Sequence, residues 1–238
     1  MGSNTRIDVI AFDADDTLWH TEYLYHEARD RLVEVLADYV DATTLADRLD
    51  ETEIGNLPLY GYGTKSFLLS MVETVIEVTG GRIRGDDVAR VIEIGRQMLT
   101  AEVRLLDDVE ATLAALQPHY ALMVITKGDA SEQMPKLTRS GLTGYFTYLE
   151  VVGTKTEATY ARILNQYGFG PDRFLMVGNS LRSDILPVLA LGGFGVYVPS
   201  EILWSHEHVD NPPSDNDRYY ELDHIADLPD LIRRLATH

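Results

Sequence analysis

The sequence predicts an α/β fold, with a parallel sheet that has helices on both faces and an all-helical segment inserted after its first strand. Two observations support this prediction. Short apolar runs alternate with helical patterns in the second half of the chain, which is typical of parallel strands joined by helices. Residues 20–103 break this alternation, because they contain consecutive helical patterns with no strand between them.

The predicted strands are short, rich in β-branched residues and bounded by turn residues, as expected for buried strands. They cover residues 9–12, 120–126, 148–152, 174–178 and 194–198. Helical patterns follow the second, third and fourth of these, at residues 131–140, 156–167 and 183–191. Residues 200–219 are polar and contain proline, so a loop with a short helix is expected there, before a last helix at residues 227–235.

The insert is predicted to contain four helices, at residues 21–39, 43–54, 64–79 and 86–101. The first of them carries apolar residues at helical spacing, and Thr64 and Asp86 stand where helix N-caps are expected. We therefore expect two domains, an α/β core formed by residues 1–19 and 104–238 and a helical domain formed by residues 20–103.

Composition excludes several classes of function. The net charge of −18 argues against a nucleic-acid partner, because phosphate backbones are bound by basic faces. The absence of cysteine excludes disulfides, thiolate zinc sites and cysteine nucleophiles. No apolar run is long enough to span a membrane and the N-terminus lacks the order of a secretory signal, so we expect a cytoplasmic protein without a membrane partner.

The basic residues are unusual, since only four are lysines, against 16 arginines. An acidic surface with few lysines indicates either ordinary solubility or adaptation to high salt. A protein this acidic needs a local cluster of positive charge to bind an anion. The lysines are therefore informative: Lys65, Lys127, Lys136 and Lys155.

The first candidate site follows the strand at residues 9–12, where Asp13, Asp15, Asp16 and Thr17 come within five residues. Ligands of parallel sheets bind beyond the carboxyl ends of the strands. Several acids at such a place are costly unless a cation or a proton compensates them. Two carboxylates two residues apart suit a reaction in which one attacks and the other handles a proton. Alternatively, Asp15 and Asp16 only cap the next helix.

Three further strand ends carry polar residues. Thr126 and Lys127 precede a glycine turn whose backbone N–H groups are suited to phosphate oxygens. Lys155 stands between a strand and a helix, and Asn179 and Asp184 follow the strand at residues 174–178. Each signal alone is weak, because a helix cap, a common turn or a surface lysine explains it equally well.

Taken in order, these residues resemble the four motifs of the haloacid dehalogenase superfamily. In that family a strand ends in D-x-D-x-T, a second strand ends in Thr or Ser, a Lys precedes a later helix, and a further strand ends in G-D-x-x-x-x-D. Asp13, Asp15 and Thr17 match the first motif in full, Thr126 the second and Lys155 the third. The fourth matches at Asp184, but Asn179 replaces its first acid.

The resemblance covers nearly the whole chain. It implies a Rossmann-like core, with the helical insert in the place of the family's type 1 cap. It also implies a Mg²⁺-dependent phosphohydrolase. Asp13 would take the phosphoryl group and bind the metal. Asp15 would protonate the leaving oxygen and then activate water, while its backbone carbonyl binds the metal. An acid at position 15 favours a phosphatase over a dehalogenase, because a halide leaves without a proton.

The other roles follow from the same resemblance. Thr126, Lys127 and Lys155 are expected to bind the transferring phosphoryl group. Asp184 completes the metal site, with Asn179 as a further ligand through its amide oxygen. Because Asn is neutral, we expect a functional but weakened Mg²⁺ site.

The helical insert is expected to choose the substrate, a small phosphorylated metabolite. Residues 59–67 are the candidate specificity loop, with Lys65 as a substrate-binding residue, although a helix–helix turn with a solvated lysine fits equally well. A Schiff base at a lysine of the insert is a weaker alternative, known from related phosphonate hydrolases. Trp204, His206 and His208 surround Glu207, but their spacing does not match a zinc helix, so a loop anchored by the tryptophan is favoured.

Two other functions remain open at this stage. The same scaffold serves intramolecular phosphomutases, and Asn179 raises the alternative of a degenerate binding protein without catalysis. The sequence does not identify the substrate or the oligomeric state.

Overall fold

The computed structural model describes residues 7–202, 204, 207, 209 and 211–236. Contacts between Cα atoms divide the chain into two compact units. We call the first the α/β unit; it contains Met1–Glu22, Val103–Lys127 and Gln133–His238. We call the second the helical unit; it contains Tyr23–Glu102 and the short segment Gly128–Glu132.

The α/β unit is built on a six-stranded parallel sheet, which confirms the predicted fold class. The strands lie in the order β3 (Tyr148–Val152), β2 (Ala121–Lys127), β1 (Val9–Phe12), β4 (Phe174–Gly178), β5 (Phe194–Tyr197) and β6 (Tyr219–Glu221). β1 is central, and its Phe12 pairs in register with Val124 of β2 and Val177 of β4. The carboxyl ends of β2, β1 and β4 therefore lie next to one another.

Helices cover both faces of this sheet. On one face, Ile10 and Phe12 of β1 belong to a core shared with α5 (Val109–Leu116), α6 (Ala130–Arg139) and α9 (Leu228–Ala236). On the other face, Val9 and Ala11 pack in a core with α7 (Glu157–Tyr167) and α8 (Leu186–Ala190). All four residues of β1 are fully buried, which explains why this strand is a continuous apolar run instead of an alternating one.

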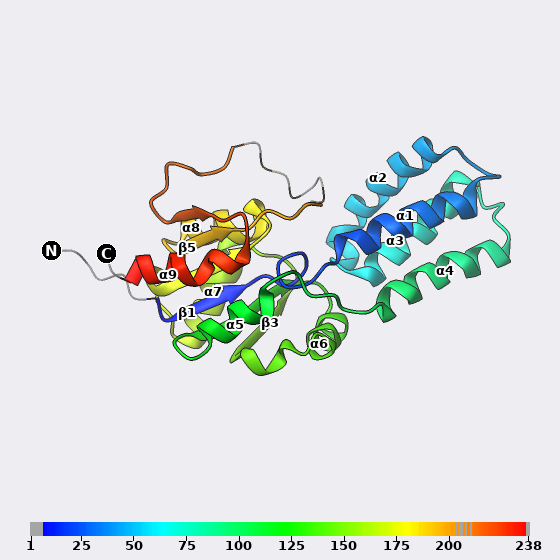
Figure 1. The fold of residues 1–238 in the computed structure, drawn as a ribbon. Helices are drawn as coiled ribbons and strands as arrows, with labels where there is room; N and C mark the ends of the chain where they lie inside the picture. The colour runs from blue at the N-terminus through cyan, green and yellow to red at the C-terminus, as the bar shows by residue number, and fades with distance from the viewer. Residues whose placement is uncertain (1–6, 203, 205–206, 208, 210, 237–238) are drawn as a thin grey trace. The chain divides into compact units, whose positions relative to one another are not determined.

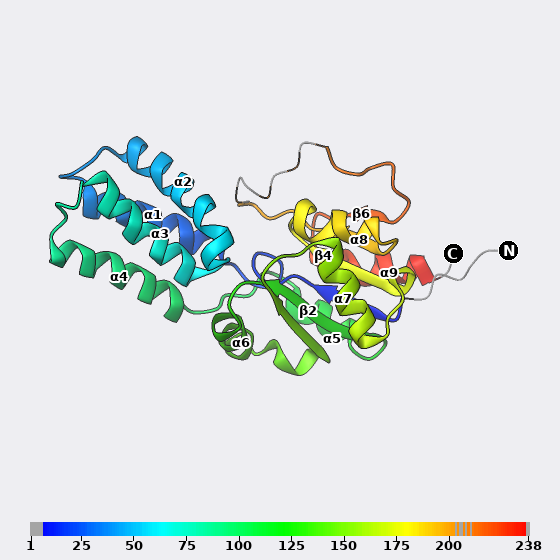
Figure 2. The same cartoon turned by 180° about the vertical axis from the view of Figure 1, so that it is seen from behind.

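The helical unit is a bundle of α1 (Glu22–Leu36), α2 (Ala42–Tyr60), α3 (Thr64–Val78) and α4 (Gly85–Thr100) (Figures 1 and 2). Its apolar core draws on all four helices and is separate from the cores of the sheet. Asp41 caps α2 by accepting the N–H of Thr44 at 2.9 Å. Residues 23–102, all of which the structure describes, contain no strand.

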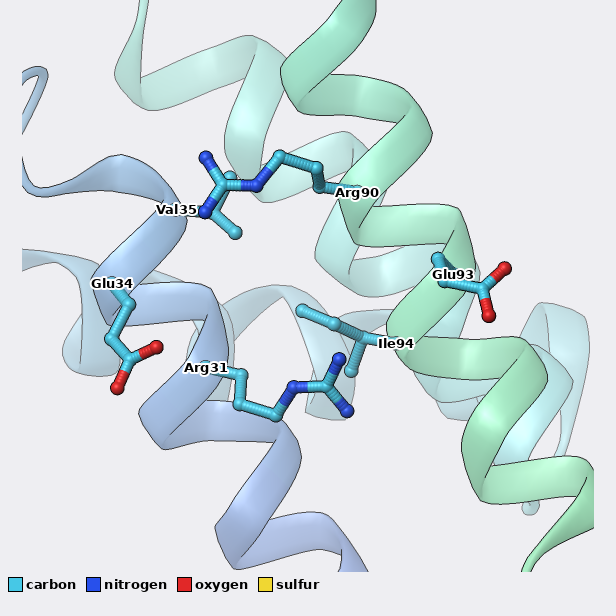
Figure 3. A pocket seen from close by; sticks show the side chains of 6 residues that line it. All are labelled: Arg31, Glu34, Val35, Arg90, Glu93 and Ile94. Carbon is cyan, nitrogen blue, oxygen red and sulfur yellow. The ribbon is translucent and has the colours of Figure 1, made fainter.

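A pocket of about 200 Å³ lies between α1 and α4 (Figure 3). Val35 and Ile94 supply its apolar lining, and two arginines and two glutamates complete it: Arg31, Arg90, Glu34 and Glu93. Arg31 donates to Gln97 at 2.6 Å and Arg90 pairs with Asp87 at 3.4 Å. None of these residues belongs to the predicted site.

The elements differ from the prediction at several places. The N-caps of α3 and α4 are Gly63 and Arg84 instead of Thr64 and Asp86, and α1 ends at Leu36 instead of residue 39. α5 was not predicted, because its eight residues give only two turns of pattern. β6 begins at Tyr219, where a loop was expected, and three edge residues are too few for a period to be visible. α2 continues through Pro58 to Tyr60, six residues beyond the predicted end at Ile54. The helix predicted at residues 183–191 begins as a π-helical turn, Leu181–Ile185.

No helix of the described part of the chain is long and apolar enough to cross a membrane.

Candidate active site

The predicted site residues of the α/β unit gather at one edge of the sheet. Asp13 directly follows β1, and Thr126 and Lys127 end β2. Lys155 comes three residues after β3, while Asp184 lies in the turn after β4. Because all these strands are parallel, their carboxyl ends face the same way, and the residues that follow them meet.

Lys155 joins the two acids of the centre. Its ammonium group donates to Asp13 Oδ1 at 2.5 Å and to Asp184 Oδ1 at 2.6 Å. All three residues are buried, with exposed fractions of 7% for Asp13, 5% for Lys155 and 1% for Asp184. Two carboxylates therefore share one positive charge in a place that water hardly reaches, which favours the binding of a further cation.

The pKa of Asp13 reflects this arrangement. Burial is the largest influence and raises the pKa, Lys155 lowers it, and Asp184 raises it again, with the result that it stands at about 7. Lys155 thus favours the ionised form of Asp13 but does not outweigh burial. For Lys155 itself, burial lowers the pKa, but the two carboxylates dominate and raise it above its ordinary value, so the lysine stays charged.

Thr17 brings Asn179 to the same centre. The Thr17 hydroxyl oxygen lies 3.3 Å from Asp13 Oδ2 and 3.4 Å from Asn179 Oδ1. The carboxylate of Asp13 and the amide oxygen of Asn179 therefore face a common point from two neighbouring strands.

The turn after β4 is shaped around Asp184. Its Oδ2 accepts the N–H of Ser180 at 3.0 Å, while its own N–H donates to the carbonyl of Ser180 at 2.9 Å. A Cβ on Gly178 would lie 2.3 Å from Asp184 Oδ2, so only glycine fits there. The π-helical turn that carries Asp184 is a local irregularity of the kind that often occurs at functional sites.

The residues could hold a hard cation. Among the residues that the structure describes, no three or more His, Cys, Asp or Glu side chains form a metal-binding group. A magnesium site at this edge would combine the carboxylates of Asp13 and Asp184 with neutral oxygens and water. Mg²⁺ commonly binds with one or two carboxylates and several waters, so this donor set fits it.

Asp15 is held by four partners. Its Oδ1 accepts from Trp19 Nε1 at 2.8 Å, from Thr21 Oγ1 at 2.7 Å and from the Lys136 ammonium; its Oδ2 accepts from Gln133 Nε2 at 2.6 Å. Burial alone would raise the pKa of Asp15, but the charge and hydrogen bond of Lys136, together with the bonds from Thr21 and Gln133, lower it to about 2. Asp15 is therefore a carboxylate at neutral pH.

Sequence reasoning did not assign Lys136 or Gln133 to the site, although the rarity of lysine was a usable signal. Both lie on α6, three residues apart, which places them on one side of the helix. Three of the four lysines, at positions 127, 136 and 155, thus contact acids at this edge of the sheet.

Asp16 caps the next helix, which is the structural alternative that the sequence analysis left open for it. Its carboxylate accepts the backbone N–H of Thr21 at 2.9 Å and of Glu22 at 3.0 Å, where α1 begins. Its φ of 58° is rare for a residue with a side chain, and aspartate tolerates it better than most. Burial raises the pKa of Asp16 to about 6, although both backbone hydrogen bonds lower it.

Thr126 and Lys127 lie side by side in sequence but have different partners. The Thr126 hydroxyl accepts from Gln133 Nε2 at 3.1 Å and is buried. The Lys127 ammonium donates to Ser183 Oγ at 3.1 Å and forms an ion pair with Glu207. Sequence reasoning placed Glu207 in an anchored loop and did not assign it to the site.

The predicted His-Glu-His segment is described only in part. Trp204 and Glu207 are described, but His206 and His208 lie outside the described residues.

Lys65 belongs to the helical unit. Its ammonium pairs with Asp129 at 2.7 Å and contacts Ser131 Oγ at 2.5 Å. Beside it, the carboxylate of Glu132 accepts the N–H and hydroxyl of Thr64, at 3.1 Å and 2.6 Å, and so caps α3. The Lys65 side chain is 48% exposed, and its role as a substrate-binding residue stays a prediction.

Comparison with known proteins gives a consistent result. Residues 7–192 match the haloacid dehalogenase-like hydrolase family. A haloacid dehalogenase-like hydrolase from Xanthomonas campestris is 39% identical in sequence; the match covers 97% of this chain and 92% of that protein, with a TM-score of 0.87.

Two more distant proteins are also similar. A glyceraldehyde 3-phosphate phosphatase from Methanothermobacter thermautotrophicus is 25% identical, over 95% of this chain and its own full length. The Bacillus subtilis protein YfnB, a HAD-type hydrolase solved with bound magnesium, is 17% identical, covers 95% of this chain and 99% of its own, and has a TM-score of 0.66; this likeness shows the fold alone. The matched region spans most of the chain and includes Asp13, Lys155 and Asp184. The chain therefore belongs to the haloacid dehalogenase-like hydrolase family.

Proposed function

We propose that this enzyme is a Mg²⁺-dependent phosphohydrolase that cleaves small phosphate monoesters through a phosphoryl group carried on Asp13. The observation that carries the proposal is the buried group in which Lys155 bonds to both Asp13 and Asp184 at the carboxyl edge of the sheet. Such a place offers an attacking carboxylate, a fixed positive charge and oxygen ligands for a metal in one small volume.

In the first step, Asp13 attacks the phosphorus and displaces the leaving oxygen. The attack requires an ionised Asp13, whose pKa of about 7 without metal leaves much of it protonated at neutral pH. Mg²⁺ held by Asp13, the Asp15 carbonyl, Asn179 and Asp184 would supply positive charge that favours this ionisation and neutralises the phosphoryl oxygens. Lys155 adds a fixed charge beside the reacting oxygen, and Thr126 presents a buried hydroxyl at the adjoining strand end.

Asp15 is proposed to handle the protons. In the second step it accepts a proton from the water that attacks the phosphorus, while the bond between phosphorus and the Asp13 oxygen breaks and inorganic phosphate leaves. The ionised state of Asp15 suits this role. In the first step a sugar alkoxide needs a proton, which Asp15 does not hold while Lys136 and Gln133 bond to it. We propose that substrate binding loosens these bonds, so that Asp15 takes up a proton before the leaving group departs.

The helical unit is proposed to recognise the part of the substrate that does not react, with Lys65 as a contact. The Methanothermobacter relative acts, by its name, on glyceraldehyde 3-phosphate, a small monoester. A substrate of similar size is consistent with our proposal.

A panel of phosphate esters, assayed with Mg²⁺ and with EDTA, tests the proposed function. We expect release of inorganic phosphate that EDTA abolishes and that Asp13→Asn eliminates. Conversion to an isomeric phosphate without release would indicate a mutase, and binding without turnover of any ester would indicate a degenerate protein.

A further inference from the structure

We propose that Glu207 is a positioning residue of this active site, which holds Lys127 and the turn after β4 in place through one carboxylate. Glu207 comes from the segment after β5, outside all four motifs of the family. The inference rests on the proposed function, because the part that it positions is the proposed phosphoryl and metal site.

The carboxylate of Glu207 is the centre of a buried hydrogen-bond group. Its Oε1 forms the ion pair with Lys127. Its Oε2 accepts from the hydroxyls of Ser180 and Ser183, the latter at 2.6 Å. Glu207 is only 7% exposed, and burial would raise its pKa, but Lys127 and the two serines lower it to about 2. It is therefore charged and has a full set of partners, as a buried acid requires.

Three further hydrogen bonds connect these contacts with Asp184, on the proposed metal side of the site. Ser180 Oγ, which donates to Glu207, accepts the backbone N–H of Ser183 at 3.0 Å. The N–H and the carbonyl of Ser180 both bond to Asp184. The position of the Glu207 carboxylate thus fixes the turn that carries Asp184.

The same contacts span the strand that carries Asp13. β1 lies between β2 and β4 in the sheet. Lys127 ends β2, and its ammonium bonds to Ser183, which follows β4, at 3.1 Å. The bond therefore joins the end of β2 to the turn that follows β4, and these are the two strands on either side of β1. Glu207 holds the far end of the Lys127 side chain and so fixes the place of its ammonium group beside Ser183.

The proposed positioning role of Glu207 can be distinguished from a role in which Glu207 only keeps the charge of Lys127 away from the phosphate. If Glu207 positions the site, its loss weakens the binding of phosphate. If instead it only keeps Lys127 away from the phosphoryl pocket, its loss releases a cation and tightens the binding of phosphate. The two roles of Glu207 therefore predict opposite changes in the affinity for phosphate.

The test compares Glu207→Gln, Lys127→Met and the double variant with wild type. Gln keeps the size of Glu and one acceptor oxygen but removes the charge. Glu201→Gln is the matched control, because it makes the same change at an exposed position of the same segment. The first readout is the inhibition constant of inorganic phosphate in aryl phosphate hydrolysis, together with a direct titration of phosphate by calorimetry. The second is hydrogen exchange at the amides of Ser183 and Asp184.

We expect Glu207→Gln to weaken phosphate binding about tenfold, as expected for the loss of charge-assisted hydrogen bonds, and to speed exchange at both amides. The double variant should be no worse than the single ones, because the two residues act as one unit. Tighter phosphate binding, an effect no larger than that of Glu201→Gln, or additive losses would each overturn the proposal. Faster exchange with unchanged phosphate binding would also overturn it, since Glu207 would then only stabilise the turn.

The two proposals fail in different ways. Wild-type protein that hydrolyses no ester would refute the proposed function, while calorimetry and hydrogen exchange would still decide the role of Glu207. Normal wild-type turnover with an inert Glu207→Gln change would refute the further inference alone.

Discussion

Lys136 sets the protonation of Asp15, and Lys136→Met tests this most sharply. Met has a similar length and removes the positive charge together with the hydrogen bond to Asp15. The variant leaves the hydrogen bonds from Trp19, Thr21 and Gln133 in place, while burial continues to disfavour the carboxylate. We therefore expect the pKa of Asp15 to rise from about 2 in the wild type toward its ordinary value of 3.8.

The magnitude follows from charge and distance. Two opposite unit charges 4 Å apart at an effective dielectric constant of 20 attract by about 4 kcal/mol. The side chains of Lys136 and Asp15 are 13% and 29% exposed, so solvent screening reduces this to about 2 kcal/mol. A pKa of about 2 against 3.8 corresponds to a similar figure, about 2 kcal/mol.

The sign of the pH dependence is fixed by the direction of the shift. Because folding lowers the pKa of Asp15, its contribution to stability is complete above pH 3.8 and is lost as the pH falls through about 2. Lys136→Met should therefore lower the melting temperature by roughly 4–8 °C, with a nearly constant difference between pH 5 and pH 8.

Carboxyl carbon NMR of metal-free protein measures the pKa of Asp15 directly, with Asp15→Asn to assign the signal. Lys65→Met is the matched control, since its pair with Asp129 is exposed and surface pairs contribute little. An unchanged midpoint for Asp15, or equal thermal losses in both variants, would refute the reasoning.

Three further predictions concern catalysis. Asn179→Asp should lower the Mg²⁺ concentration for half-maximal activity, because an anionic ligand replaces a neutral one; a titration that gives the same or a higher value would show that charge at position 179 does not limit metal binding. Asp15→Asn should slow the first step for sugar phosphates far more than for an aryl phosphate, whose leaving group needs no proton; equal losses in single-turnover experiments would count against the acid role. Lys65→Ala should raise KM for the best ester of the panel far more than for a small aryl phosphate, and unchanged kinetics for that ester would make Lys65 an ordinary surface residue.

The sheet and its site edge could be predicted because the signals are local. A parallel strand that is buried on both faces is a short continuous apolar run, and β1 and β4 have this form throughout, as does β2 up to Thr126. The edge strand β3 is only partly buried and contains Glu150, but it is short and mostly apolar as well. The end of each run then locates a polar residue at the ligand-binding edge. This is why Asp13, Thr126, Lys155 and Asp184 could be identified one by one.

The partners of these residues could not be predicted in the same way. Lys136 and Gln133 lie more than 110 positions from Asp15 along the chain, and their contact depends on how α6 packs against the sheet. Glu207 lies 80 positions from Lys127, in a polar segment whose pattern shows only a loop. Three-dimensional packing decides which acids meet which lysines, and with that it decides the pKa values of the site.

The central claim, that Asp13 carries the phosphoryl group, is tested most directly by trapping the enzyme during turnover. Asp15→Asn protein is mixed with Mg²⁺ and an aryl phosphate, and the reaction is quenched in acid. The protein is then digested, and the mass of the peptide that contains Asp13 is measured by mass spectrometry. We predict that this peptide gains the mass of one phosphoryl group, that borohydride reduces its residue 13 to homoserine, and that Asp13→Asn removes the signal. Stoichiometric phosphate release by the wild type with no modified peptide in any quenched sample, or a phosphoryl group on another residue, would contradict the account.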